Sequence, residues 1–313
     1  MHTIYYGCDT VQMDITQQCI DKCMKDSIIR IPPNDFTRAF LFTDPCVDIL
    51  KSIYVKDETT KKILGVYDSN TTLFYDTSTN ILYSNHSTNL PEHIKLSFPD
   101  VEPVLRQIHS QLKFEYGSLN DEYPEQLLTV QFITGNENIL ELGGNTGRNS
   151  VVMGKILNEH NNTNLVVLEC SKTVAQQLTH NRNINNLFFH VEPCALSVKP
   201  IYQKEGEWVT EHSPKSGYTK VDNISFTELE TKYNIQFDTL VMDCEGAFYY
   251  ILQEMPDILQ NIKLVIMEND YNTIEQKQFV DEKMRQNGLE RVHWEAGGWG
   301  PCYPFFYEVW KRC

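Results

Sequence analysis

A glycine-rich segment and an acid that follows it are the first residues whose types and spacing could do chemistry. The segment Glu141–Gly147 reads Glu-Leu-Gly-Gly-Asn-Thr-Gly, and it includes the end of the apolar run 139–142. Glycines let a backbone pass close to a ligand, and a glycine loop after the first strand is where open α/β sheets bind nucleotides. Glu169 directly follows the next apolar run, 165–168. A carboxylate at that position can accept hydrogen bonds from both hydroxyls of a ribose. A plain strand-to-helix turn and a surface acid are the alternatives.

Three further acids follow two later apolar runs. Asp243-Cys244-Glu245-Gly246 follows the run 237–242, and strand alternation predicts that Asp243 and Glu245 point to the same side. Two such carboxylates can bind an ammonium group, accept a proton from a hydroxyl, or hold a divalent cation. Glu268 ends the run 262–267, which places another acid at the same sheet edge. Helix capping and ion pairing are the alternatives for these acids.

Other side chains are weaker candidates. His293 has the pKa range of a general base, although a lone strand histidine is more often structural. The glycine and aromatic residues of 293–302 could stack on a sugar ring or form an ordinary hairpin with core tryptophans. Four cysteines offer sulfur ligands for zinc, but they include no C-x-x-C pair, and helical spacing of two of them is typical of an apolar face: Cys8, Cys19, Cys23 and Cys46.

The elements that must position these residues alternate from residue 138 onward. Apolar strands separated by helices indicate a parallel sheet that is covered on both faces. We expect five such strands, at 139–142, 165–169, 187–191, 237–242 and 262–267, with helices through 151–157 and 174–183. Two last strands, 289–295 and 305–310, are joined by a loop too short for a crossover helix and should pair antiparallel. This layout separates class I methyltransferases, which have a Rossmann-like seven-stranded sheet with an antiparallel last strand, from dinucleotide dehydrogenases.

The first third of the chain has a different pattern. Short strand-like runs and a hairpin, with strands at 72–75 and 81–83, predict a small β-rich module, with one helix at 14–23. Helical spacing begins near residue 99, and Pro124 suits the first turn of a helix that starts near Glu122. We therefore expect a β-rich accessory domain over 1–98, and a methyltransferase domain with leading helices over 99–313.

Composition excludes several classes of protein. The chain has 313 residues, 41% of them hydrophobic, and a formal net charge of −15. Such an acidic balance argues against a nucleic-acid partner. No apolar stretch is long enough to span a membrane. The chain starts without a secretory signal and has an odd count of nine cysteines, which predicts a cytoplasmic protein with reduced thiols.

Taken together, these motifs resemble those of the FkbM family of S-adenosylmethionine-dependent O-methyltransferases, which act on hydroxyls of sugars and glycosylated compounds. The resemblance covers about residues 135–270. It rests on segments in the family's order and spacing: Ile139–Gly147, Leu168-Glu169, the Asn181-x-Asn183-x-Asn185 run, Ala195-Leu196-Ser197, Asp243–Gly246 and Glu268. The segment 117–126 and the high asparagine content look like versions encoded by giant DNA viruses, which would place the protein in a host cytoplasm with a role in glycan modification.

The resemblance implies a role for each matching residue. It implies that the glycine loop holds the methionine part of the cofactor and that Glu169 binds ribose. It also implies that Ala195 lies near adenine and that Asp243 and Glu245 face the substrate. The cofactor-binding set is then Glu141, Gly143, Gly144, Asn145, Gly147, Glu169, Cys170 and Ala195, and the catalytic set is Asp243, Glu245 and Glu268. Two positions depart from the family: Cys170 stands where proline is usual, and Ala247-Phe248 replaces a small residue and an acid.

We therefore expect methyl transfer to a hydroxyl of a sugar, nucleotide sugar or glycan, with a divalent cation as a candidate second cofactor. A methyltransferase fold that has lost activity and binds glycans, or serves as a scaffold, is the main alternative. An NAD-dependent enzyme is disfavoured because its first loop glycine would fall at Leu142. The acceptor sugar, the role of residues 1–98 and self-association into a homo-oligomer stay open.

Overall fold

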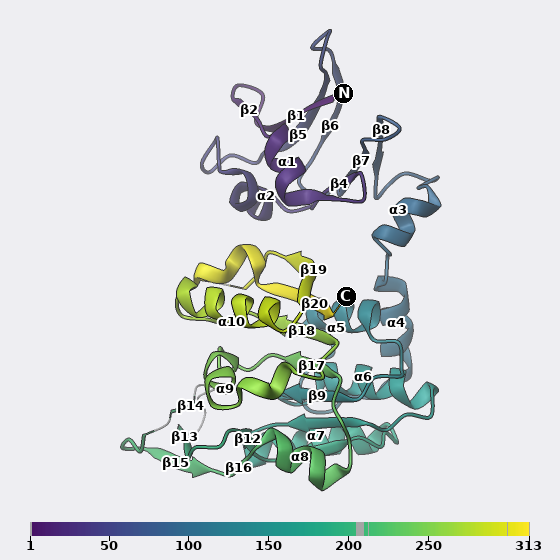
Figure 1. Ribbon diagram of the computed structural model, residues 1–313. Helices are drawn as coiled ribbons and strands as arrows, with labels where there is room; N and C mark the ends of the chain where they lie inside the picture. The colour runs from purple at the N-terminus through teal and green to yellow at the C-terminus, as the bar shows by residue number, and fades with distance from the viewer. Residues whose placement is uncertain (1, 205–209, 212, 299, 313) are drawn as a thin grey trace. The chain divides into compact units, whose positions relative to one another are not determined.

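The computed structural model describes residues 2–204, 210–211, 213–298 and 300–312. The chain divides into two compact units, Met1–Asp100 and Val101–Cys313. Each unit is described by itself below, and Figure 1 labels their elements.

The amino-terminal unit is built from short strands and three helices. Its elements are β1 (His2–Gly7), β2 (Gln12–Asp14), α1 (Thr16–Cys23), β3 (Met24–Lys25), β4 (Ile28–Ile31), α2 (Asp35–Phe42), β5 (Ser52–Asp57), β6 (Ile63–Tyr67), β7 (Leu73–Asp76), β8 (Ile81–Ser84) and α3 (Glu92–Ser97). The strands form two antiparallel sheets, in the orders β2-β1-β5-β6 and β3-β4-β7-β8. The expected β-rich module and its β7–β8 hairpin are confirmed.

One apolar core joins both sheets of this unit. Ile4 of β1 and Val55 of β5 belong to the same buried cluster as Ile31 of β4 and Leu73 of β7. Helix α1 contributes the buried Cys19 to this cluster. The two sheets therefore stabilise one another through a shared core, as small β-rich modules require.

The carboxyl-terminal unit alternates strands and helices. Its elements are α4 (Glu102–Gln111), α5 (Tyr123–Phe132), β9 (Ile139–Leu142), α6 (Arg148–Glu159), β10 (Leu165–Leu168), α7 (Lys172–Ile184), β11 (His190–Glu192), β12 (Ala195–Leu196), β13 (Ile201–Lys204), β14 (Thr210–Glu211), β15 (Tyr218–Val221), β16 (Asn223–Ile224), α8 (Phe226–Tyr233), β17 (Thr239–Met242), α9 (Phe248–Glu254), η1 (Pro256–Leu259), β18 (Leu264–Glu268), α10 (Ile274–Gln286), β19 (Leu289–Glu295), η2 (Gly300–Phe305) and β20 (Tyr307–Arg312).

Seven of these strands form the central sheet, in the order β11-β10-β9-β17-β18-β20-β19. The first five are parallel, and β20 pairs antiparallel with both β18 and β19. Five parallel strands followed by an antiparallel terminal pair is the class I methyltransferase fold that the sequence predicted. The order reverses between β9 and β17, the switch point at which open α/β sheets bind ligands.

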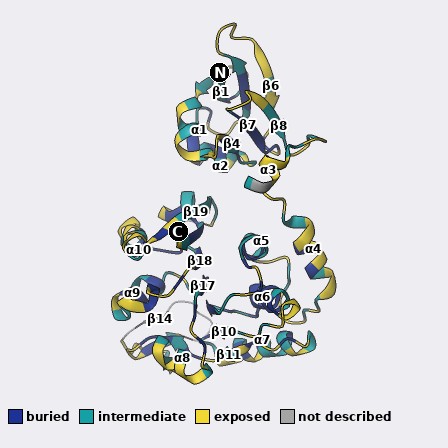
Figure 2. Cartoon of the chain, turned by 45° about the vertical axis from the view of Figure 1, so that its right-hand side comes forward, coloured by how far each residue is buried: buried dark blue, intermediate teal, exposed yellow. Residues whose placement is uncertain are grey.

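Helices cover both faces of this sheet. On one face, Leu140, Leu240 and Val265 pack in a buried cluster with side chains of α8, α9 and α10. On the other face, Ile139, Val241 and Ile266 pack with side chains of α5, α6 and α7. Figure 2 shows the central strands buried between these helices. Strand alternation thus decides which helical layer each strand residue faces.

Two parts of this unit differ from the sequence prediction. The third strand is shorter than expected, because β11 begins at His190, while residues 187–189 lie outside it. The segment 195–224 holds two small sheets, β12-β16 and β14-β13-β15, that the sequence did not predict. Their strands have two to four residues each, too few for periodicity to reveal them.

No helix in the described ranges is long and apolar enough to cross a membrane.

Candidate functional site

A cavity of about 680 Å³ opens at the carboxyl edge of the central sheet. Its walls come from the loops after β9, β10 and β17, from the small sheets of 195–224 and from α9. Five of its lining residues are acidic and, among the described residues that line it, none is lysine, arginine or histidine. The acids are Glu122, Glu169, Asp243, Glu245 and Glu254. An acidic cavity at the switch point of the sheet suits a positively charged ligand.

Gly143 fixes the course of the loop after β9. Its φ is +86°, and a Cβ placed there would lie 1.6 Å from the carbonyl oxygen of Asp243. No side chain can occupy that space, so only glycine lets the loop pass the end of β17. The backbone N–H groups of Gly143 and Gly144 both donate to the carbonyl of Leu168, at 3.1 and 3.0 Å. Gly143 itself lines the cavity.

Three other residues of the predicted loop face away from the cavity. A Cβ at Gly144 or Gly147 would meet the side chain of Leu178 on α7, at 2.8 and 3.0 Å. Glu141 is buried on the sheet face that α6 covers, where Ser150 Oγ donates a hydrogen bond of 2.5 Å to its carboxylate. Burial raises the pKa of Glu141 to about 8. These three residues therefore shape the loop and its packing, and none of them lines the cavity.

Asn145 and Glu169 form the floor between the first two strands. The backbone N–H of Asn145 donates to one oxygen of Glu169 at 3.0 Å, and the N–H of Ser171 donates to the other at 2.8 Å. These bonds hold the buried carboxylate in a fixed orientation while it lines the cavity. Each carboxylate oxygen accepts more than one hydrogen bond, so both keep capacity for a ligand hydroxyl. Burial raises the pKa of Glu169.

Cys170 and Ala195 lie on the wall that continues from Glu169. Both line the cavity, together with Leu196 of β12 and Ile201 of β13. Burial raises the pKa of Cys170 to about 11, so this thiol stays protonated at neutral pH. The described residues of 195–224 that line the cavity therefore carry no charge, and they include both apolar and polar side chains.

The sequence prediction for Asp243 and Glu245 needs a correction. Both residues line the cavity, but β17 ends at Met242, so strand alternation no longer applies beyond it. Glu245 has a φ of +51° and is exposed, and Gly246 follows with a φ of +75°. A Cβ at Gly246 would lie 3.0 Å from the carbonyl oxygen of Asp270, the residue second after β18. Glu245 therefore follows a turn that strand alternation does not describe, and it is outside the group of acids that Asp243 meets.

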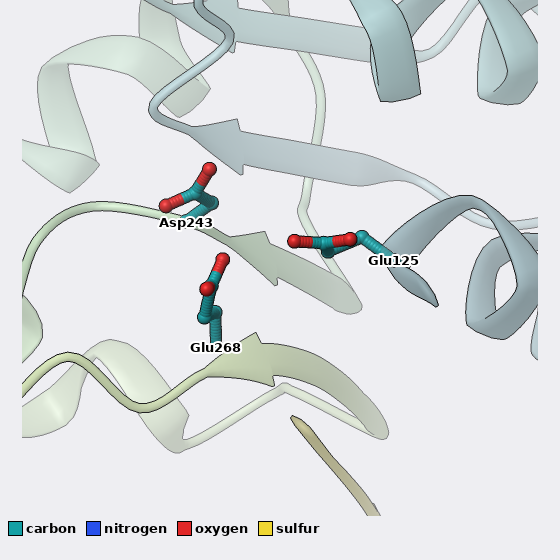
Figure 3. A group of neighbouring side chains, drawn as sticks. All are labelled: Glu125, Asp243 and Glu268. Carbon is teal, nitrogen blue, oxygen red and sulfur yellow. The ribbon is translucent and has the colours of Figure 1, made fainter. Parts of the chain in front are cut away.

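Asp243 instead meets two other acids, Glu125 and Glu268. One carboxylate oxygen from each of the three lies within 4.8 Å of the others. Strand register explains part of this cluster: Met242 pairs with Met267 in the parallel ladder, so the next residues, Asp243 and Glu268, are neighbours on the sheet face that α5 covers. Glu125 comes from the first turn of α5, and Figure 3 shows Glu125 and Glu268 extending toward the place where Asp243 lies. We call these three residues the carboxylate cluster.

Desolvation and mutual repulsion dominate the electrostatics of this edge. Burial raises the pKa of Glu125 and raises that of Asp243 well above its usual range. Burial, together with the charges of Asp243 and Glu125, also raises the pKa of Glu268. Burial and the charge of Glu245 raise the pKa of Asp270 to about 7. A nearby positive charge would therefore stabilise the ionised form of these acids.

Two of these acids were not among the residues singled out in the sequence. Glu122 and Glu125 stand at the start of α5, where the sequence indicated only helix-terminal acids. Glu122 lines the cavity, and it accepts hydrogen bonds from Arg148 at 2.5 Å and Asn145 at 3.2 Å. Its backbone adopts a left-handed conformation, with a φ of +54°. Nothing local in the sequence shows that α5 brings this turn to the sheet edge.

The weaker candidates lie elsewhere. His293 contacts Glu295 at 3.1 Å and is not among the cavity's lining residues. Trp299, part of the predicted aromatic wall, is outside the described residues. Cys8 and Cys46 have sulfur atoms 2.9 Å apart, but Cys19 and Cys23 do not join them. Within the described ranges, the carboxylate cluster is the one group of three or more side chains with metal-ligand geometry.

No family model and no curated protein matches the chain. The fold is similar to that of several solved structures. A putative O-methyltransferase from Klebsiella pneumoniae is 14% identical, with a TM-score of 0.37 over 70% of this chain and 94% of its own. An O-methyltransferase from Bacillus cereus, solved in complex with SAH, gives the same values. A ribosomal protein L11 methylase from Lactobacillus delbrueckii subsp. bulgaricus is 9% identical, with a TM-score of 0.41 over 64% of this chain and 81% of its own. These similarities concern the fold alone.

Proposed function

We propose that the carboxyl-terminal unit binds S-adenosylmethionine in the cavity at the sheet edge and transfers its methyl group to a hydroxyl of a sugar, nucleotide sugar or glycan. The observation that carries the proposal is Glu169. Its carboxylate ends the second strand, is oriented by two backbone N–H groups, and faces a cavity at the switch point. That is the position from which an acid binds the hydroxyls of a ribose.

The rest of the cavity is compatible with the remaining parts of the cofactor. Cys170 and Ala195 line the wall beside Glu169, where an adenine ring would lie. Gly143 and Asn145 line the loop side, where the methionine part would lie. The ammonium and sulfonium groups of the cofactor are positive, and the acidic lining favours both charges. The predicted roles of Glu141, Gly144 and Gly147 in this scheme are indirect, through the shape of the loop.

Methyl transfer asks the protein mainly for alignment, because the sulfonium already activates the methyl group. The acceptor oxygen, the methyl carbon and the sulfur must lie in line, and the acceptor hydroxyl must lose its proton. Asp243 and Glu245 both line the cavity and can accept that proton. Partial desolvation raises the pKa of Glu245, which makes its carboxylate a stronger base than an ordinary glutamate.

Calorimetric titration with S-adenosylmethionine tests the cofactor. We expect saturable binding to one site per chain, weakened at least about tenfold by Glu169→Ala because the ribose loses its acceptor. Glu282→Ala, an exposed acid on α10, is the matched control and should bind normally. No binding by the folded protein would overturn the cofactor assignment, and unchanged binding by Glu169→Ala would remove its ribose role.

Transfer of a labelled methyl group to nucleotide sugars and oligosaccharides tests the acceptor class. Once an acceptor is found, Asp243→Asn and Glu245→Gln should lower kcat, and the larger loss identifies the base. Cofactor binding without methyl transfer to any carbohydrate would instead favour an inactive methyltransferase fold that binds glycans. Wild-type turnover by both variants would exclude both acids as the base.

A further inference from the structure

The carboxylate cluster joins three elements that are distant in the sequence. Glu125 comes from the first turn of α5, Asp243 follows β17, and Glu268 is the last residue of β18. One oxygen of each lies within 4.8 Å of the others. Divalent cations of the calcium and magnesium class bind oxygen ligands at about 2.0–2.6 Å, so oxygens around one ion are up to about 4–5 Å apart. The spacing in the cluster matches ligands that share one ion.

A second observation concerns the most buried member. Glu125 is only 9% exposed, and its Oε2 atom is buried with no hydrogen-bond partner. Its side chain points into the space between Asp243 and Glu268 (Figure 3). A buried carboxylate oxygen without a partner is costly, and native structures usually satisfy such an atom with protein, water or an ion. This atom therefore offers an unused acceptor to a water molecule or an ion.

The nearby basic side chain, Arg148, already forms ion pairs with other acids. Arg148 contacts Glu122 at 2.5 Å and Asp121 at 3.5 Å. Within the ranges that the structure describes, no lysine or arginine forms an ion pair with Glu125, Asp243 or Glu268. The negative charge of the cluster is therefore balanced either by protons on the carboxyl groups or by a cation from outside the chain.

We propose that Glu125, Asp243 and Glu268 bind a divalent cation with a preference for oxygen ligands, such as Mn²⁺, Ca²⁺ or Mg²⁺. Three monodentate carboxylates leave coordination positions for water or for an oxygen of a ligand. Asp243 belongs both to this site and to the cavity wall, so the cation lies at the border of the cavity. Cation binding does not depend on methyl transfer, and it is testable without S-adenosylmethionine.

The experiment uses the full chain, freed of metal with a chelator and then titrated with Mn²⁺ at pH 7.5. Electron paramagnetic resonance of free Mn²⁺ counts the bound ions, and calorimetry with Ca²⁺ measures the second ion. We expect one site per chain with a Kd well below about 1 mM, the weak limit for protein calcium sites. Bound cation should also raise the Tm, because it binds the folded state only.

Two variants test the ligands separately. Glu125→Gln and Glu268→Gln keep the side-chain size and remove one negative charge each, so each should weaken Mn²⁺ binding at least about tenfold. Glu282→Gln is the matched control, since Glu282 is an exposed acid on α10 outside the cluster and should leave Mn²⁺ binding unchanged. Circular dichroism and the Tm without metal show that each variant folds. Absence of a Mn²⁺ site in the wild type, or undiminished binding in both cluster variants, overturns the proposal.

Discussion

The two sides of the sheet edge differ in the hydrogen-bond donors that their buried acids have. On the side of β9 and β10, Glu141 accepts a hydrogen bond from Ser150, and Glu169 accepts two from backbone N–H groups. On the side of β17 and β18, no described residue donates a hydrogen bond to Asp243, and Glu268 has only Glu125 as a partner. The first side therefore holds its carboxylates in place with its own chain.

This difference indicates what each side can accept. A carboxylate oriented by the chain's own donors has a fixed direction, which suits recognition of hydroxyl groups on a ligand. Carboxylates that face each other with few hydrogen-bond donors repel one another until a cation or a proton joins them. The edge thus combines a preformed hydrogen-bonding wall with a site that is completed from outside. Four substitutions test this difference between the two sides.

Gly143→Ala should have the largest effect, because it disturbs the contact between the two sides. The added Cβ would lie 1.6 Å from the carbonyl oxygen of Asp243, and alanine is also strained at a φ of +86°. We expect a loss of more than about 3 kcal/mol of unfolding free energy. All four tryptophans lie beyond residue 200, so their fluorescence in urea follows the carboxyl-terminal unit.

Gly217→Ala is the matched control for this substitution. Gly217 has a similar φ of +83°, but nothing lies within 4 Å of its added Cβ. It should cost only the backbone strain, about 1 kcal/mol. Equal losses for the two variants would show that the contact with Asp243 does not constrain the loop.

Glu141→Gln should change how stability depends on pH. The folded carboxyl has a pKa of about 8 against 4.5 for a model carboxyl, so the folded state holds a proton that the unfolded state releases. Its contribution is complete below pH 4.5 and is lost as the pH rises toward 8. Relative to wild type, Glu141→Gln should gain on the order of 4 kcal/mol between pH 4.5 and 8, as urea titrations can measure. A constant difference across this range would contradict the raised pKa.

Ser150→Ala tests whether the internal donors matter on the first side. It removes the hydroxyl that bonds Glu141 at 2.5 Å inside the α6 layer. We expect a loss of about 1–3 kcal/mol in urea unfolding, since a buried carboxyl is left without its partner. Ser110→Ala, at an exposed position of α4, should lose far less. Similar losses at both positions would mean that this hydrogen bond contributes little.

Glu245→Gln should have the smallest effect on stability. The side chain is exposed and stands outside the carboxylate cluster, so we expect a change within about 0.5 kcal/mol in the same urea assay. A large gain in stability would mean that Glu245 also repels the cluster, and the boundary between the two sides would need to be redrawn.

Much of the fold could be predicted because it depends on local patterns. Apolar strands separated by helices gave the parallel sheet, and the short loop after residue 295 predicted the antiparallel terminal pair. The small sheets of 195–224 could not be predicted, because strands such as β12 and β16 have two residues each. The pairing of β12 with β16 also joins strands on either side of the segment 197–222, a contact that local sequence patterns do not show.

The site was predictable only where it follows from strand ends. Gly143, Glu169 and Asp243 line the cavity and follow directly from their strands. Glu125 was missed, because a helix contributes it across a long sequence separation. Asp243 and Glu268 are neighbours because of the register of the β17–β18 ladder. The sequence alone does not determine this register.

The two close backbone contacts limit how the loops of this edge can vary. The loop after β9 passes the carbonyl of Asp243 at Gly143, and the loop after β17 passes the carbonyl of Asp270 at Gly246. An insertion in either loop would push against the next one along the sheet. By contrast, a Cβ added at Gly217, between β14 and β15, has nothing within 4 Å. Insertions should therefore be tolerated better at this turn than in the loops after β9 and β17.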